Sequence, residues 1–293
     1  MPGNENAALS ADALQALLPD VLAAAREAGA LAAERFCTAV HCERKADGSP
    51  VTEVDLAVDA LLRQRLRAVL PEAGWLSEES TTGDEWLSHR QAWCIDPLDG
   101  TGGYLRRDPH WCISVALLQD GAPVLGVIHA PALQRTWQAA RGGGALMNGM
   151  TARVSIRQAL AGARIIGPKS LEDAAAWQTP WPRVEVRRYP SLALRLAYVA
   201  SGEADGMLAL GGKNYWDVAA GDIIVREAGG IISDAEGAPL RYDRAAARVN
   251  GVIAASAALH GEMLALARGW RGCARHGRKK HGRRKHHQWG SEA

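Results

Sequence analysis

Cysteine is scarce in this sequence and is not arranged as disulfide-rich folds or zinc sites require. Five of the 293 residues are cysteine, and no two of them form a CxxC pair: Cys37, Cys42, Cys94, Cys112 and Cys273. An odd number without paired spacing argues against both a disulfide framework and a structural zinc site. We therefore expect reduced thiols, most of them packed in the core as small apolar side chains.

Long apolar stretches are also missing. No apolar run approaches the roughly 20 residues that a membrane-spanning helix needs. The first residues, MPGNENAALSADA, lack the basic start and apolar stretch of a signal peptide. We expect a cytoplasmic protein without a membrane segment. A composition of 47% hydrophobic and 23% charged residues is that of a globular chain with one large domain or two medium ones.

The small net charge of +2 conceals a strongly basic C-terminus. Residues 271–293 carry eight Lys or Arg and one Glu, a net charge of +7, which leaves −5 for residues 1–270. Since this segment has almost no apolar residues, it cannot bury enough surface to fold alone. We expect a flexible tail that could attract nucleic acid, an anionic substrate or an acidic partner. An extension without a specific role is the alternative.

The spacing of apolar residues predicts an α+β first half. Helices are expected over residues 10–36, with Ser10 as the N-cap, and from Thr52 to about Pro71. The polar string HCERKADGSP between them is expected to be a loop. Strands then follow in AWCI, in a hairpin around residues 120–121, and in a meander through RTWQAARGGGALMNG.

The second half alternates between the two kinds of element. The expected helices are SLEDAAAW, SLALRLAYVASG, DVAAGDIIVREAGG and AALHGEMLALARGW, and the expected strands are ARIIG, RVEVRRY, ADGMLAL, IISD and GVIAAS. This rhythm is typical of an α/β unit. It places a domain boundary between residues 1–153 and 154–270, with the tail at 271–293.

Acidic residues recur where these elements are expected to end. They are Glu78 and Glu79 after GWLS, Asp96 and Asp99 around AWCIDPLDG, Asp217 at a helix start and Asp55 in a first helical turn. Two carboxylates as close as Asp96 and Asp99 repel unless a cation lies between them or both face water. Pro97 keeps the chain between them out of a helix, so both can face one point. Taken singly, each acidic residue could instead be a helix cap, a turn residue or a loop charge.

Four motifs, in order, resemble the lithium-sensitive, magnesium-dependent phosphatase superfamily: KADGSPVTEVD, LSEES, IDPLDGT and NYWDVAAGDIIVREAGG. The superfamily includes inositol monophosphatases and 3'(2'),5'-bisphosphate nucleotidases, and the similarity covers nearly all of residues 10–270. The resemblance implies a five-layer αβαβα sandwich with its active site between the two halves. It also implies a Mg²⁺-dependent phosphoric monoester hydrolase, with a homodimer as a candidate assembly.

The same resemblance implies two to three Mg²⁺ ions. Glu78, Asp96 and the Leu98 carbonyl would hold the first ion, and Asp96, Asp99 and Asp217 the second. A third, weaker ion would lie near Glu78. Asp96 would then bridge two cations, which offset the repulsion between the carboxylates.

Catalytic and substrate-binding roles also follow from the resemblance. Glu78, Asp55 and Thr101 would be catalytic, with the Asp55–Thr101 pair orienting and deprotonating a water whose pKa the metal lowers. The N–H groups of Gly100 and Thr101 would cradle the phosphate, next to Asp99 and Asp217. We expect Glu79 to lie behind the metal ligands and Lys45 to line the entrance of the site.

The substrate is expected to be a bisphosphate nucleotide such as 3'-phosphoadenosine 5'-phosphate. Inositol monophosphatases usually carry a Glu at the position of Leu210, and LGGKNYWD looks more like the nucleotidases. Arg195 falls where nucleotidases often have a Lys, so it is the main candidate for a second phosphate, with Lys213 and the pair Arg106-Arg107 as further candidates. Each could instead be a solvated surface charge. Inositol phosphate, another sugar or polyol phosphate, and histidinol phosphate remain alternatives.

Two features depart from a plain phosphatase. Family members usually follow Gly-Thr with polar or basic residues, whereas this chain has Gly102-Gly103, which predicts a looser first helical turn and missing substrate contacts. The basic tail also leaves open a different class of protein, a nucleic-acid-associated scaffold. Retention of all the candidate metal ligands argues against a scaffold that has lost its activity.

Overall fold

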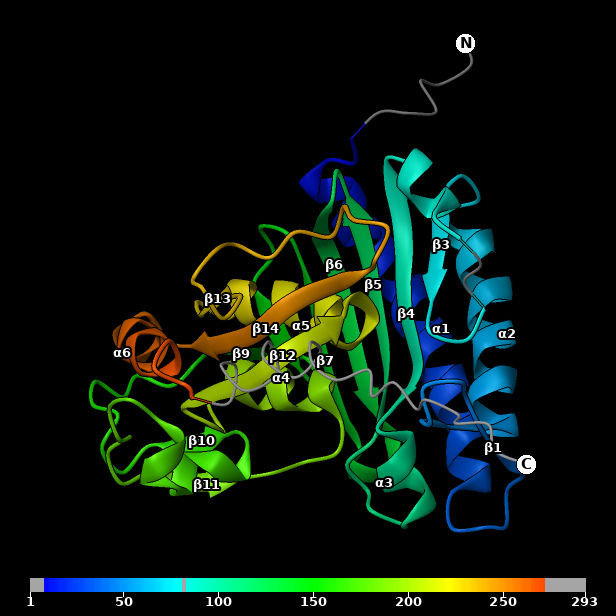
Figure 1. Ribbon diagram of the computed structural model, residues 1–293. Coiled ribbons are helices and arrows are strands. Elements are labelled where there is room, and N and C mark those ends of the chain that lie inside the picture. Colours follow the sequence, from blue (N-terminus) through cyan, green and yellow to red (C-terminus); the bar gives the residue numbers. More distant parts are fainter. Residues whose placement is uncertain (1–7, 81–82, 272–293) are drawn as a thin grey trace, which may run out of the picture.

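Five layers in the order αβαβα make up the part of the chain that the computed structural model describes, residues 8–80 and 83–271 (Figure 1). The predicted sandwich is thereby confirmed. The predicted tail lies outside the described residues, except for Arg271. None of the described helices is both long enough and apolar enough to cross a lipid bilayer. The four described cysteines are free; Cys94 and Cys112 are buried, but Cys37 and Cys42 are exposed, so only half of them pack in the core.

Two long helices form the first layer, α1 (Ala11–Arg35) and α2 (Glu53–Val69). Both begin at the predicted caps, because Ser10 Oγ accepts a hydrogen bond from Ala13 N, and Thr52 Oγ1 accepts from the first turn of α2. The string between them is not only a loop, since β1 (Cys42–Arg44) and β2 (Pro50–Thr52) pair there as a short antiparallel hairpin. Apolar side chains of α1 and α2 are buried against the next layer.

A seven-stranded sheet forms the second layer, with its strands side by side in chain order. They are β3 (Gly74–Ser77), β4 (Gln91–Asp99), β5 (Cys112–Gln119), β6 (Ala122–Ala130), β7 (Arg135–Ala140), β8 (Ala145–Met147) and β9 (Met150–Ala152). In this sheet only β3 and β4 pair in parallel, and β5 and β6 form the predicted hairpin. Strand β4 is longer than predicted, because it continues past Asp96 through an irregularity in its register with β5 and ends at Asp99.

The fourth layer is a mixed five-stranded sheet in the order β11-β10-β12-β14-β13. Its strands are β10 (Arg164–Ile166), β11 (Glu185–Arg187), β12 (Gly206–Asn214), β13 (Ile231–Ser233) and β14 (Arg248–Ala255). The prediction of a helix over SLEDAAAW is wrong. This segment forms two separate 3₁₀ turns, η3 (Lys169–Glu172) and η4 (Ala174–Ala176), because Asp173 between them has an extended backbone and its side chain accepts a hydrogen bond from Ala175 N.

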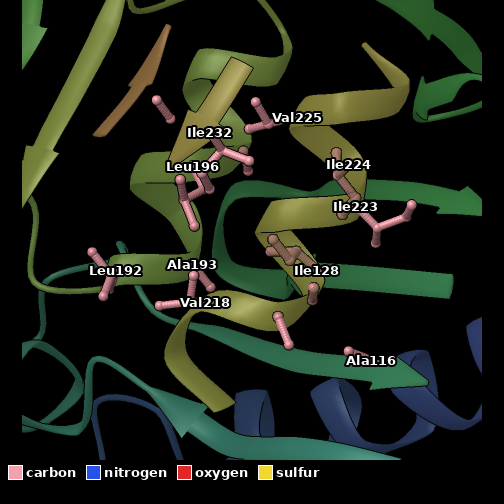
Figure 2. Close-up of a cluster of buried hydrophobic side chains, with 14 of the residues drawn as sticks. Ala116, Ile128, Leu192, Ala193, Leu196, Val218, Ile223, Ile224, Val225 and Ile232 are labelled. Carbon is pink, nitrogen blue, oxygen red and sulfur yellow. The ribbon is translucent and has the colours of Figure 1, made fainter. Parts of the chain in front are cut away.

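Helices α4 (Leu192–Ala200) and α5 (Tyr215–Glu227) fill the middle layer, and α6 (Ala257–Ala267) covers the outer face of the second sheet. Figure 2 shows side chains of α4 and α5, such as Leu196 and Val218, gathered with Ile128 of β6. One buried cluster combines residues of both sheets with these two helices. The predicted boundary at residue 153 falls between the sheets and stays a prediction, because the two halves share this core.

An ion pair at the start of β12 leads to a prediction about stability. Burial of Asp205 raises the pKa of its carboxyl. Hydrogen bonds from Arg164 and Ser155 lower this pKa by more than burial raises it, so that it lies at about 2. Because this pKa lies below that of the unfolded chain, the stabilisation is complete above about pH 4 and is lost as the pH falls through 2. We expect Asp205→Asn to lower the free energy of unfolding by about 2 kcal/mol at pH 7. Urea titrations of both proteins at pH 7 and pH 3 test this, and an equal difference at the two pH values would contradict it.

Candidate metal centre

Three carboxylates from different elements converge at one end of the first sheet. Glu78 follows β3, Asp96 lies in β4 and Asp217 in the first turn of α5, and one oxygen of each lies within 4.8 Å of the others. The parallel pairing of β3 with β4 aligns Ser77 with Ile95, which brings Glu78 beside Asp96. Asp217 does not open its helix as predicted, because α5 begins at Tyr215 with Asn214 as its cap. The structure thus brings together residues that lie far apart in the sequence.

The electrostatics of this cluster suit a hard cation. Burial, followed by the charges of Glu78 and Asp99, raises the pKa of Asp96 well above its usual range. Burial, followed by the charges of Asp99 and Glu78, raises the pKa of Asp217 to about 8. Carboxylate and carbonyl oxygens are the ligands that Mg²⁺ prefers, and the positive charge of an ion would relieve this repulsion. The donor set therefore fits the predicted metal.

Asp99 connects the two halves of the chain. Its Oδ2 accepts from Ser191 Oγ at 2.7 Å and from Ala193 N at 2.6 Å, both at the start of α4. Ser191 Oγ also caps α4 by accepting from Leu194 N at 3.0 Å. Ser191 was not among the predicted site residues, and the available signal was its place as the serine that opens the string SLALRL, at the N-cap of α4.

The Asp55 carboxylate serves two partners, one at each oxygen. Oδ2 accepts from Thr52 N at 2.9 Å and from Thr52 Oγ1 at 2.5 Å, so Asp55 is part of the capping box of α2. Oδ1 accepts from Thr101 Oγ1 at 2.9 Å, the predicted pair. Thr101 Oγ1 lies equally close, 2.9 Å, to the Leu98 carbonyl oxygen. Its single proton can satisfy only one acceptor fully, so donation to Asp55 leaves the Leu98 carbonyl available to a cation.

Lys45 lies against the acidic residues rather than only at an entrance. Its Nζ donates to Glu78 Oε1 at 2.7 Å and to Glu79 Oε1 at 2.6 Å. Burial raises the pKa of Glu79 to about 7, although the Lys45 hydrogen bond acts in the opposite direction. Lys45 therefore supplies part of the positive charge that this end of the cluster needs.

The glycines after Asp99 pack more closely than predicted. Gly100 has φ 98°, a conformation that favours glycine, and it begins the short helix α3 (Thr101–Leu105). A Cβ on Gly103 would lie 2.6 Å from Pro190 Cγ, whereas one on Gly102 would meet only the end of the Arg106 side chain at 3.4 Å. Gly103 thus lets α3 pack directly on Pro190, the residue before Ser191. The turn is closely packed at Gly103 and not loose.

We expect Gly103→Ala to disturb metal binding without touching a ligand. The new methyl group would displace Pro190 and with it Ser191, which orients Asp99. Changes to residues that orient metal ligands typically cost 10–100-fold in metal affinity or activity, so the Mg²⁺ concentration for half-maximal activity should rise at least roughly tenfold. Gly102→Ala is the matched control, because its methyl group has space. Equal effects of the two substitutions would contradict the prediction.

A pocket of about 290 Å³ is lined only by residues of the second half of the chain, between Gly167 and Trp270, and none of the four carboxylates lines it. It is lined by three cationic side chains, Arg188, Arg195 and Lys213, and by apolar ones that include Leu210. Arg195 Nε donates to the Tyr189 carbonyl at 2.8 Å; burial lowers the pKa of Arg195, and the charges of Asp99 and Asp217 act in the opposite direction. Burial lowers the pKa of Lys213, and the charge of Arg195 lowers it further. The other predicted candidates, Arg106 and Arg107, do not line this pocket.

Comparison with known proteins agrees with this geometry. The model of the inositol monophosphatase family matches residues 14–269. Nus factor SuhB of Xylella fastidiosa is 38% identical over 211 residues, 68% of this chain and 74% of that protein. The 3'(2'),5'-bisphosphate nucleotidase CysQ of Aggregatibacter actinomycetemcomitans is 35% identical over 80% of this chain and 90% of its own. Histidinol-phosphatase of Mycobacterium tuberculosis is 36% identical over 79% of this chain and 92% of that protein.

Solved structures agree as well. The inositol monophosphatase TM1415 of Thermotoga maritima superposes with a TM-score of 0.75 at 30% identity, over 86% of this chain and 96% of that one. Together with the family match, this likeness confirms both the predicted superfamily and the predicted reaction class. The chain belongs to the inositol monophosphatase family, whose members are Mg²⁺-dependent hydrolases of phosphoric monoesters.

Proposed function

We propose that this protein removes the 3'-phosphate of 3'-phosphoadenosine 5'-phosphate or of a similar bisphosphate nucleotide. The observation that carries the proposal is the cationic pocket, because the charge of Asp217 acts on two of its side chains, Arg195 and Lys213. Arg195 and Lys213 make it suitable for a second phosphate, and Arg188 adds positive charge although Glu172 pairs with it. Leu210, where inositol monophosphatases usually carry a Glu, gives the pocket an apolar wall that cannot grip ring hydroxyls.

The metal would be held by oxygens that the fold already gathers. In this proposal Glu78, Asp96, Asp99, Asp217 and the Leu98 carbonyl hold two to three Mg²⁺ ions. Bound Mg²⁺ supplies Lewis acidity to the phosphate oxygens and lowers the pKa of water. The ligands come from both halves of the chain, so closure of the site depends on the packing of α4 and α5 against the first sheet.

The chain itself provides the base and the phosphate cradle. Asp55 Oδ1 holds the Thr101 hydroxyl, so Thr101 Oγ1 can accept a proton from the attacking water while it passes its own to Asp55. Gly100 and Thr101 stand at the start of α3, where N–H groups have no partner within the helix and can donate to phosphate oxygens. These residues bind the phosphate, orient the attacking water and move its proton, all on one side of the phosphorus.

Phosphate release by the purified protein with Mg²⁺ tests the substrate. The compounds are 3'-phosphoadenosine 5'-phosphate, inositol-1-phosphate, fructose-1,6-bisphosphate and histidinol phosphate, with Asp99→Asn as the blank. We expect at least a tenfold preference for the adenosine compound in kcat/KM, about 1.4 kcal/mol in transition-state binding. A preference for histidinol phosphate or inositol phosphate would replace this proposal by the corresponding phosphatase.

A second candidate function is nucleic-acid binding by the basic tail. Residues 271–293 carry a net charge of +7, and the relative from Xylella fastidiosa bears the name Nus factor, not phosphatase. The last described residue, Arg271, adjoins Trp270 at the cationic pocket. A tail attached there could contribute positive charge toward any polyanion that approaches the site.

Removal of residues 272–293 separates the two uses of the tail. If the tail binds nucleic acid alone, RNA affinity at low salt should fall at least roughly tenfold while kcat/KM stays the same. If the tail captures substrate, kcat/KM should fall too, and the loss should shrink as salt rises. Unchanged RNA affinity would reject the second candidate. For both candidates we propose a cytoplasmic location and a homodimer, and light scattering of the purified protein tests the dimer.

A further inference from the structure

The cationic pocket contains one aromatic side chain, Trp270, that neither the metal centre nor the phosphate cradle uses. Trp270 directly follows residues 14–269, which the family model matches, so that match assigns it no role. Trp270 is partly buried and packs on the outer apolar cluster that includes Leu208 and Met263. It also lines the pocket together with Arg195, Lys213 and Leu210. An aromatic face beside cations and apolar walls is a combination that suits a planar, charged ligand.

The backbone holds Trp270 firmly in this place. Trp270 forms an isolated antiparallel bridge with Trp177. On its two sides, Gln178 N donates to the Gly269 carbonyl at 2.7 Å, and Arg271 N donates to the Ala176 carbonyl at 2.9 Å. These contacts fix a residue that lies beyond the last helix, α6. A residue whose backbone is already held loses less freedom when a ligand binds to its side chain, which favours it as a recognition surface.

Among the described residues, the ring of Trp270 also has no aromatic or cationic stacking partner. Within residues 8–80 and 83–271, no ring or guanidinium stacks on it, whereas Trp177 pairs with Trp181 and Arg63 lies over Trp75. Core packing alone would account for the partial burial of Trp270. It does not account for its place in the lining of a pocket whose other polar groups are cations.

We propose that Trp270 is the stacking platform for the base of a nucleotide, with a phosphate of the same nucleotide held by Arg195 and Lys213. The inference deepens the proposed function and rests on it for the orientation of the scissile phosphate toward the carboxylates. It makes Trp270 a specificity residue, which contacts the base and not the reacting atoms. A nucleotide would thus be distinguished from a sugar phosphate by its base as well as by its second phosphate.

The test uses a pair of ligands that differ only in the base, AMP and ribose 5-phosphate. Dissociation constants are measured by calorimetry on the full chain with Mg²⁺, for the wild type and for Trp270→Leu, Trp270→Phe and Lys213→Met. We expect the wild type to bind AMP roughly tenfold more tightly than ribose 5-phosphate, because stacking of a base on an aromatic ring contributes on this scale. Trp270→Leu should abolish that ratio, Trp270→Phe should restore most of it, and Lys213→Met should weaken both ligands equally.

Each other outcome is decisive. If Trp270→Leu still binds AMP tenfold more tightly than ribose 5-phosphate, or if the wild type binds the two ligands equally, the stacking platform is rejected. Trp181→Phe is the matched control, because Trp181 belongs to the same apolar cluster but does not line this pocket, and it should leave the ratio unchanged. Binding is measured without turnover of a bisphosphate. A confirmed ratio with no preference in the phosphate-release assay would reject the nucleotidase reaction and leave the platform standing.

Discussion

Asp96→Asn is expected to lower Mg²⁺-dependent phosphate release roughly 10³-fold or more, since it removes a buried carboxylate that is central to the cluster. The same substitution should raise the melting temperature of the metal-free protein. Burial, followed by the like charges of Glu78, Asp99 and Asp217, disfavours the ionised form of Asp96 and raises its pKa, and a neutral amide of the same shape avoids both costs. Thermal melts with EDTA and with Mg²⁺, beside the activity assay, measure both effects.

Asp222→Asn is the matched control for this substitution. Asp222 is also buried, and it lies in the same helix as Asp217, but it pairs with Arg226 and Tyr242 away from the cluster. Its replacement should lower stability with and without Mg²⁺ and should leave the response to Mg²⁺ intact. If Asp96→Asn destabilises the metal-free protein as Asp222→Asn does, the account of a buried carboxylate that is repelled by its neighbours is wrong.

Asp55→Asn should lower kcat by roughly 10²–10⁴-fold while the Mg²⁺ concentration for half-maximal activity changes little. An amide has one acceptor oxygen, whereas Asp55 accepts from Thr52 on one side and from Thr101 on the other. The substitution must therefore give up either the helix cap or the proton path. Steady-state kinetics over a range of Mg²⁺ concentrations separate an effect on kcat from an effect on metal binding.

Two further variants sharpen this prediction. Thr101→Val keeps the shape of the side chain without its hydroxyl, and it should cost about as much as Asp55→Asn. The double variant should cost no more than either single one, because the pair acts as a unit. Asp59→Asn, one turn further along α2, removes a buried carboxylate that accepts from Ser77 instead, and it should keep most of the activity. Additive losses in the double variant would show that Asp55 and Thr101 act independently.

Local patterns predicted the parts of the fold that are locally stabilised. The caps at Ser10 and Thr52 and the hairpin at residues 120–121 depend on a few neighbouring residues, and the structure confirms them. Where a local pattern competed with another local preference, the prediction was wrong. Asp173 starts a second 3₁₀ turn within the expected helix SLEDAAAW, because its side chain offers the backbone an alternative partner.

The sequence by itself determined the residue types and the motif order, and the family resemblance that they carry predicts Glu78, Asp96, Asp99 and Asp217 as metal ligands. Only the tertiary structure decided how they are arranged. The pairing of β3 with β4 sets Glu78 beside Asp96, and Ser191 at the start of α4 fixes Asp99. The same holds for Gly103 against Pro190 and for Trp270 at the pocket. These contacts join segments distant in the chain, so they arise from the packing of layers and leave no periodic or local signal in the sequence.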